Sequence, residues 1–168
     1  MQQLSEAIKA ANSSGDLVSL TMANHWIGHL YADNCEFDKS LYHLNKALEI
    51  STVAKIPWGI AAQKSCIART VYLYQGLVKL GYSLSCEGFQ SAEESGDPLS
   101  RAEAFLSLGW AYLEKGQLDD SVNILLKSVE LCERFNFAAL YSGAECCLGE
   151  TYYFMKCPKN TKRTHFES

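Results

Sequence analysis

Apolar and small residues in one part of the chain recur with the spacing of two helices that face each other. The spacing i, i+3, i+4, i+7 links one face of the first run: Phe105, Leu108, Gly109 and Tyr112. After the short polar stretch KGQL, a second run carries a facing stripe: Leu118, Ser121, Val122, Leu125, Ser128 and Val129. The pattern predicts an antiparallel pair of helices joined by a tight turn.

The same outline recurs along the chain with a period of about 40 residues. Tyrosines recur at spacings of 41, 40 and 40: Tyr31, Tyr72, Tyr112 and Tyr152. Pairs of small residues seven apart follow the first three: Ser40 with Ala47, Gly81 with Gly88, and Ser121 with Ser128. Asp97 and Pro98 suit the N-cap and the first position of a helix, and Pro57 lies 41 residues before Pro98. Because one helix pair cannot bury both of its stripes, we expect the units to stack.

The repeats divide residues 1–155 into one solenoid. We expect a partial unit at 1–16, complete units at 17–56, 57–97 and 98–137, and the first helix of a fourth at 138–155. Residues 156–168 are a basic tail or a truncated second helix. The second complete unit departs from the others, because Arg69 stands where Gly28 and Gly109 stand. Either Ala68 takes over the close contact there, or that helix pair packs more loosely.

Composition fits a reduced, cytoplasmic, all-helical protein. Hydrophobic residues make up 48% of the chain, and the net charge of −4 favours neither nucleic acid nor membrane as a partner. We expect no signal peptide, because the first residues, MQQLSEAIKAANSSGD, do not have its pattern. Its seven cysteines lack framework spacing, and most lie on apolar faces of expected helices: Cys66, Cys86, Cys132 and Cys146. Of the adjacent Cys146 and Cys147, we expect one or the other to be buried. No phosphate loop, nucleophile elbow, HExxH or CxxC motif occurs, so we expect no enzyme and no cofactor.

Residues 102–131, AEAFLSLGWAYLEKGQLDDSVNILLKSVEL, resemble the tetratricopeptide repeat almost throughout. Residues 21–50 match it fairly and residues 62–91 less well. With the joints and the partial units, over residues 1–155, the resemblance covers about nine-tenths of the chain. The period of about 40 is similar to the repeats of maltose-regulator-type activators, kinesin light chains and the regulatory arms of class III nucleotide cyclases. The resemblance implies an all-α, right-handed solenoid of stacked antiparallel helix pairs. It also implies that the first helices line a concave groove.

By that resemblance the groove is the candidate binding site. We expect it to be lined by Met22, His25, His29, Asp33, Gln63, Thr70, Tyr74, Glu103, Leu106, Trp110, Leu113, Glu114, Cys146, Glu150 and Tyr153. Family members that clamp a chaperone's C-terminal carboxylate use Lys, Arg and Asn on these faces. Here the faces carry His, Gln, Thr and Glu, so we expect a polar or basic peptide instead. Trp110 is either an exposed peptide anchor or packs against the first helix of the next unit.

One pair of residues in the groove has the spacing of a metal site. His25 and His29 lie four residues apart on one expected helix face, which can bind a divalent ion. No acidic or cysteine residue completes an obvious tetrad, although Asp33 continues the face. We therefore expect two polar residues that line the groove, and no metal.

The expected function is protein–protein interaction through the groove, as a scaffold or regulatory module in a longer array. The alternative is the sensory or regulatory arm of a signalling enzyme, such as a nucleotide cyclase, a STAND-type ATPase or a transcription regulator. In that case the catalytic or DNA-binding domain lies elsewhere. An RNA-binding role is disfavoured by the acidic body of the chain. Neither end carries a polar capping helix, so self-association through the ends is a further expectation.

Overall fold

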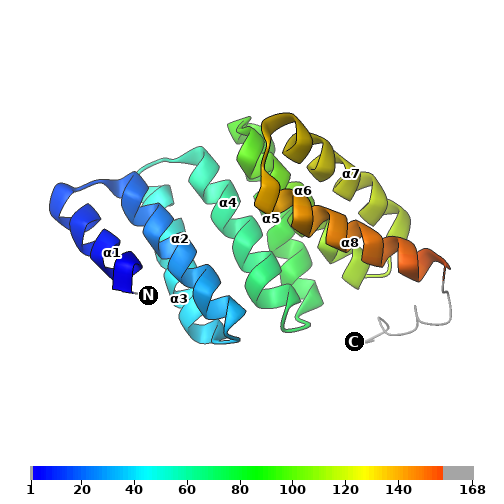
Figure 1. The fold of residues 1–168 in the computed structure, drawn as a ribbon, viewed down its shortest axis with the longest axis horizontal. Helices are drawn as coiled ribbons and strands as arrows, with labels where there is room; N and C mark the ends of the chain where they lie inside the picture. The colour runs from blue at the N-terminus through cyan, green and yellow to red at the C-terminus, as the bar shows by residue number, and fades with distance from the viewer. Residues whose placement is uncertain (1, 157–168) are drawn as a thin grey trace.

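The computed structural model describes residues 2–156, and these residues form helices joined by short turns. Consecutive helices lie antiparallel and stack side by side from the N-terminal end to α8 (Figure 1). The predicted all-α solenoid of helix pairs is confirmed. The elements are α1 (Gln2–Ser14), α2 (Leu17–Asp33), α3 (Phe37–Val53), α4 (Pro57–Ile67), the π-helix η1 (Ala68–Leu73), α5 (Val78–Ser95), α6 (Pro98–Glu114), α7 (Leu118–Phe135) and α8 (Ala138–Lys156).

Turns within and between the pairs repeat as regularly as the helices do. At each turn inside a pair, the carbonyl of a repeated tyrosine accepts a hydrogen bond from a backbone N–H five residues on, at 2.8–2.9 Å: Tyr31, Tyr72 and Tyr112. At each joint between pairs, one residue has a positive φ of 53–69°: Gly15, Lys55, Gly96 and Asn136. These left-handed residues end the helices and turn the chain into the next unit.

Close helix contacts occur where a glycine faces a leucine. A Cβ added to Gly28 would lie 2.5 Å from Leu44, and one added to Gly109 would lie 2.6 Å from Leu125. Small buried residues of the second helix complete the contact, as where the Ser121 hydroxyl donates to the Gly109 carbonyl at 2.8 Å. The repeated glycines and serines of the sequence therefore bring the two helices of a pair together.

In the pair α4–α5, the close approach of the two helices is achieved by different residues. Tyr31, Tyr112 and Tyr152 each lie 14 residues after the start of their helix, whereas Tyr72 lies 15 residues after Pro57. The π-helix η1 lies in this stretch, and a π-turn is the form in which a helix accommodates one extra residue. Here the close contact is made by Gly81 of α5 against Leu73. Of the two alternatives expected for this unit, looser packing is not what the structure shows, because the two helices approach closely at Gly81. Buried Ala68 lies at this contact, with its carbonyl oxygen 3.5 Å from the Cβ position of Gly81.

The core runs along the solenoid between neighbouring helices. One cluster joins α6, α7 and α8, a second joins α3, α4 and η1, and an alanine cluster joins α4, α5 and α6. Cysteines contribute to the core as expected at Cys66 and Cys132. The expectation that Cys146 lies on an apolar face was wrong, because this side chain is exposed and its neighbour Cys147 is the buried one. Adjacent positions on a helix differ by about 100°, so only one of the two can face the core.

Candidate functional site

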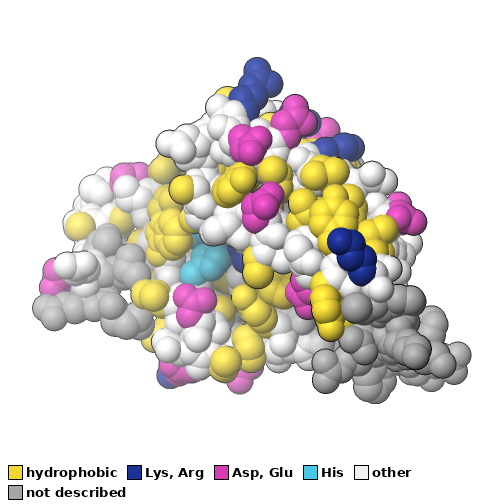
Figure 2. All heavy atoms as spheres, turned by 45° about the vertical axis from the view of Figure 1, so that its right-hand side comes forward, with side chains coloured by type: hydrophobic (Ala, Val, Ile, Leu, Met, Phe, Trp, Pro, Cys, Tyr) yellow, Lys and Arg dark blue, Asp and Glu magenta, His cyan; other side chains and the backbone are white. Residues whose placement is uncertain are grey.

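A cavity of about 600 Å³ opens between the first helices of successive units. Figure 2 shows a hollow with histidine at its floor and hydrophobic side chains on both sides. The helix α2 forms one wall, α4 and α6 form the floor, and the start of α8 forms the opposite wall. The lining residues are Met22, His25, Trp26, His29, Asp33, Trp58, Ala62, Gln63, Arg69, Leu99, Ser100, Glu103, Leu106, Phe137, Ala138, Ala139, Leu140 and Gly143.

Apolar side chains dominate the rim of the cavity. Trp26 is 51% exposed and Leu99 is 44% exposed, although both are large and apolar. Trp58 and Phe137 are half-buried beside them in the same lining. Exposed apolar side chains gathered around a hollow mark a surface on which another molecule can bind.

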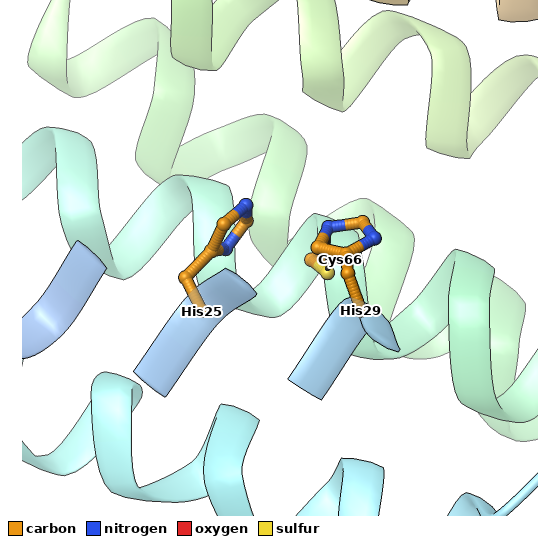
Figure 3. Close-up of side chains that lie close together, drawn as sticks. All are labelled: His25, His29 and Cys66. Carbon is orange, nitrogen blue, oxygen red and sulfur yellow. Dashed lines mark hydrogen bonds between the residues drawn. The ribbon is translucent and has the colours of Figure 1, made fainter. Parts of the chain in front are cut away.

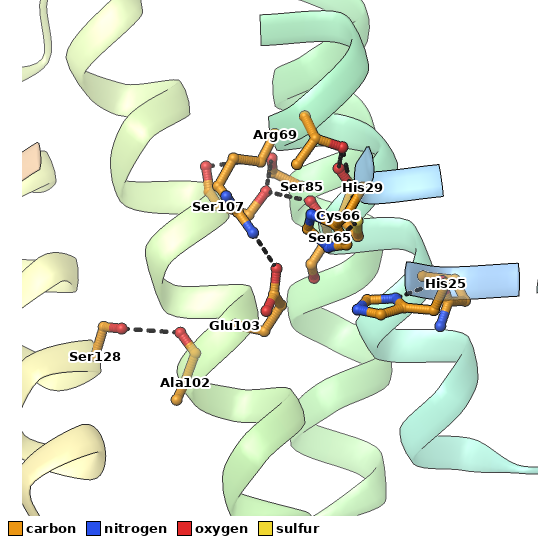
Figure 4. A network of polar contacts seen from close by, with 12 residues as sticks. His25, His29, Ser65, Cys66, Arg69, Ser85, Ala102, Glu103, Ser107 and Ser128 are labelled. Carbon is orange, nitrogen blue, oxygen red and sulfur yellow. Dashed lines mark hydrogen bonds and ion pairs between the residues drawn. The ribbon is translucent and has the colours of Figure 1, made fainter. Parts of the chain in front are cut away.

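A buried ion pair lies at the floor. A guanidinium nitrogen of Arg69 lies 2.7 Å from a carboxylate oxygen of Glu103, and both side chains are nearly buried (Figure 4). Burial by itself would raise the pKa of Glu103, but the charge and hydrogen bond of Arg69, together with the nearby His25 and His29, outweigh it, and the pKa of this carboxyl is lowered. The two charges therefore neutralise each other inside the protein, and they join η1 to α6.

Two histidines and a cysteine lie together beside this pair. His25 and His29 project from α2 toward α4, where Cys66 lies (Figure 3). The Cys66 sulfur is 3.1 Å from Nε2 of His29, and Nδ1 of His25 is 3.0 Å from the side-chain oxygen of Gln63. Burial, and then the neighbouring His25, lowers the pKa of His29 to about 4. Burial, and then the charge of Glu103, raises the pKa of the Cys66 thiol to about 12. A buried neutral thiol is a poor nucleophile, so the contact between Cys66 and His29 is not that of a catalytic dyad.

Buried hydroxyl groups connect the helices that form the floor of the cavity. The hydroxyls of Ser85 and Ser107 lie 2.8 Å apart, and the Ser107 hydroxyl donates to the Ser65 carbonyl at 3.0 Å (Figure 4). These three residues belong to α5, α6 and α4. The helices that position Cys66 and Glu103 are thus hydrogen-bonded to one another within the core.

Seven of the residues expected in the groove line the cavity. They come from α2, α4 and α6: Met22, His25, His29, Asp33, Gln63, Glu103 and Leu106. Gln63, Glu103 and Leu106 are themselves almost fully buried, so the cavity exposes only a small part of each. The structure therefore brings seven of the fifteen expected residues together around one hollow.

The other expected residues lie elsewhere. Thr70 and Leu113 are buried in the core, where the Thr70 hydroxyl donates to the Cys66 carbonyl at 2.8 Å. Half-buried Trp110 packs against a cluster that includes α8, which is the second of its two expected roles. Its indole N–H donates to Glu114 at 3.1 Å, and its ring meets the edge of Tyr74. Three side chains are exposed on α8, outside the cavity lining: Cys146, Glu150 and Tyr153.

Sequence reasoning missed eleven of the lining residues, among them Trp26, Trp58, Arg69 and Leu99, and it also missed Cys66 beside the cavity. A usable signal existed for Arg69, whose long charged side chain replaces a glycine of the repeat. None existed for Cys66, because its distance from His29 depends on how α2 and α4 stack. The basic tail cannot be compared in this way, since residues 157–168 lie outside the described part of the chain.

Comparison with known proteins identifies one repeat directly. Residues 102–135 match the family described as tetratricopeptide repeat, which covers nearly all of α6 and the whole of α7. No curated protein matches the chain. Within residues 2–156, no helix has both the length and the apolar character that crossing a membrane requires. Residues 102–135 are therefore similar to a tetratricopeptide repeat, and the helix pairs on either side of them stack as such repeats do.

Proposed function

We propose that this chain binds a segment of a partner protein in the cavity, and that the segment inserts a bulky apolar side chain against the rim. A tetratricopeptide repeat implies a protein–protein interaction module, which sets the class of function. The observation that carries the finer proposal is the cavity of about 600 Å³ with a half-exposed tryptophan at its edge. Its volume is within the range of sites that enclose a small ligand or a few side chains.

The chemistry of the rim and the floor suits an anchoring side chain. Tryptophan is among the residue types that contribute most to interface energies, and Trp26 keeps half of its surface exposed. Beneath it, the neutralised pair of Arg69 and Glu103 and the hydrogen-bonded Gln63 form a polar floor held by α4, η1 and α6. In this proposal the apolar rim supplies most of the binding affinity. The fixed polar floor orients the bound side chain.

Charge contributes less to this proposal than the sequence indicated. Glu103 was expected to attract a basic peptide, but its charge is satisfied by Arg69. Glu114 accepts a hydrogen bond from Trp110, and Glu150 lies outside the cavity lining. Asp33 is the exposed carboxylate in the lining. We therefore propose an apolar anchor, with any basic residue of the partner segment near the α2 wall.

The test is a matched pair of variants. Peptides selected from a random display library against the wild-type chain would be measured with Trp26→Ala and with Tyr42→Ala. Tyr42 is also an exposed aromatic residue within a helix, but it lies on α3 and outside the cavity lining. We expect Trp26→Ala to weaken binding by about 30-fold, as the loss of about 2 kcal/mol at an anchoring residue implies.

Tyr42→Ala should leave the dissociation constant within about twofold of the wild type, as expected for a residue outside the interface. Circular dichroism would first show that both variants are as helical as the wild type. The reverse pattern, in which only Tyr42→Ala weakens binding, would place the interface on the α3 side and refute the proposal.

A further inference from the structure

The side chains of His25, His29 and Cys66 are arranged as metal ligands usually are. One ligand atom from each lies within 4.8 Å of the other two. Two ligand atoms on a tetrahedral zinc ion are about 3.3–3.6 Å apart, for bond lengths of about 2.0–2.3 Å. The separation of 3.1 Å between Cys66 and His29 needs only a small expansion to admit an ion. Rotation of exposed or half-buried imidazole rings supplies such adjustments, and both histidines are half-buried.

The surroundings of the three residues resemble the support that a metal site requires. The side-chain oxygen of Gln63 is positioned to accept the Nδ1–H of His25, which leaves Nε2 of that ring with its lone pair. Gln63 is 1% exposed, so this partner is fixed by packing. His25 and His29 lie in adjacent turns of α2, and the helix holds their separation. Ligands from one rigid helix, with a third from its neighbour, form a preorganised set.

Charge also permits a cation at this place. A neutral imidazole such as that of His29 offers a ring nitrogen lone pair to a metal ion. A divalent ion would replace the thiol proton of Cys66, because coordination deprotonates a thiol that burial keeps neutral. The thiolate would then cancel one of the two positive charges. The nearby Arg69 charge is already neutralised by Glu103.

We propose that His25, His29 and Cys66 bind one divalent transition-metal ion of the zinc type. Two imidazole nitrogens and a thiolate are ligands that zinc prefers, and three protein ligands leave a fourth coordination position. The histidines line the cavity, whereas Cys66 lies behind them, so the fourth position faces the cavity. A water molecule or a donor group of a bound molecule would complete the tetrahedron there. The proposal does not depend on the proposed partner binding, and its test requires no partner.

The test measures zinc and cobalt(II) binding by the reduced full-length chain. Competition with a chromophoric chelator gives the zinc affinity and stoichiometry, and cobalt(II) reports a thiolate ligand through a charge-transfer band in the near ultraviolet. We expect one equivalent of zinc to bind, and the cobalt complex to show that band. Cys66→Ser should abolish the band, and His29→Gln should weaken zinc binding by at least about 100-fold, since even loss of a supporting residue costs about 10–100-fold.

Matched controls address the other cysteines and histidines. Cys147 is also a buried cysteine, and His43 is also a histidine hydrogen-bonded to an amide, but neither belongs to the cluster. Cys147→Ser and His43→Gln should therefore keep the stoichiometry and the band. Gln63→Ala should weaken zinc binding by about 10–100-fold without removing the band, because it frees the His25 ring but leaves the thiolate in place.

Three results would overturn the proposal. The first is no saturable binding of zinc by the wild-type chain. The second is binding that Cys66→Ser and His29→Gln leave unchanged, which would assign the ion to another set of ligands. The third is a cobalt complex without a thiolate band. If Cys66→Ser is not helical by circular dichroism, His25→Gln decides the matter, since this half-buried residue can be changed without opening the core. In that variant zinc affinity must fall as it does in His29→Gln.

Discussion

Cys35 has a backbone conformation that glycine provides in the equivalent turns of the other units. Its φ is 59°, while Gly76 and Gly116, which follow it at spacings of 41 and 40 residues, have φ of 71° and 73°. A side chain in the left-handed region crowds the neighbouring carbonyl and costs about 1–2 kcal/mol per residue. The first complete unit therefore contains a strained residue that the repeat itself does not require.

Replacing this residue should stabilise the chain. Cys35→Gly removes the strain but adds freedom to the unfolded chain, so we expect the free energy of unfolding to rise by up to about 1 kcal/mol. Gly116→Ala makes the opposite change in the equivalent turn and should lower it by about 1 kcal/mol. Urea titration followed by circular dichroism measures both. A stabilising Gly116→Ala would show that the left-handed turn carries no strain.

Single residues also determine the structure of the cavity floor. Arg69 replaces a repeat glycine and, through η1, reaches Glu103 of α6. Leaving one member of a buried pair without the other is strongly unfavourable. The pair therefore fixes the floor of the cavity in one arrangement, with the histidine cluster beside it.

At the scale of helices, the repeated glycines do not all have the same role. Gly28 and Gly109 face leucines of the second helix of their pair, at distances that no Cβ tolerates. Gly149 has the same place in the repeat, three residues before a tyrosine, but has no neighbour within 4 Å of its Cβ position. The reason is that, within residues 2–156, α8 is not followed by a second helix of its own unit that could pack on this face.

This difference predicts opposite effects for the same substitution. Gly109→Ala should destabilise the chain by about 1–3 kcal/mol, because the new methyl group collides with Leu125. Gly149→Ala should stabilise it by up to about 1 kcal/mol, because alanine is the better helix former. Thermal or urea unfolding of the two variants beside the wild type tests the pair. Similar effects at both positions would mean that the contact with Leu125 relaxes without cost.

The π-helix η1 accommodates one extra residue in the first helix of its unit. One extra residue between Pro57 and Tyr72 would rotate everything after it by about 100° in a regular helix. Confined to η1, the extra residue leaves the Tyr72 turn in register, and its carbonyl still accepts from Leu77 at 2.9 Å. Because π-turns often occur at functional sites, its position beside the cavity agrees with the proposed binding there.

At the scale of the molecule, each pair of helices is stabilised by its neighbours. The helix α8 covers the apolar face of α6 and α7, where it adds Ala144, Cys147 and Leu148 to the cluster around Leu106 and Leu113. It also supplies one wall of the cavity. In stacked repeats, stability is approximately the sum of such nearest-neighbour contacts.

Removing α8 should therefore affect both stability and the cavity. A chain that ends at residue 137 is compared with one that ends at residue 156. We expect the shorter chain to lose several kcal/mol of stability, since burial of each large apolar side chain contributes about 1.5–3 kcal/mol. Urea unfolding measures the loss, and the peptides selected for the cavity should bind the shorter chain more weakly. Equal stability of the two chains would show that α8 does not contribute to the core.

The sequence by itself predicted the repeating architecture, because that architecture depends on local rules. Apolar spacing, turn residues and the repeated tyrosines are set within some forty residues, and each helix pair repeats the same solution. The sequence also indicated which helices form the groove, and seven of the residues expected there line the cavity. The division into numbered units, the partner and self-association remain predictions.

Only the tertiary structure decided which side chains meet across units. The contact between His29 and Cys66 joins residues 37 apart, and the ion pair of Arg69 and Glu103 joins residues 34 apart. Neither separation equals the repeat, because these contacts depend on the angle between stacked helices and, for Arg69, on its place in the π-helix η1. Periodicity specifies which face of a helix is buried, and the stacking of one helix on the next specifies its neighbours.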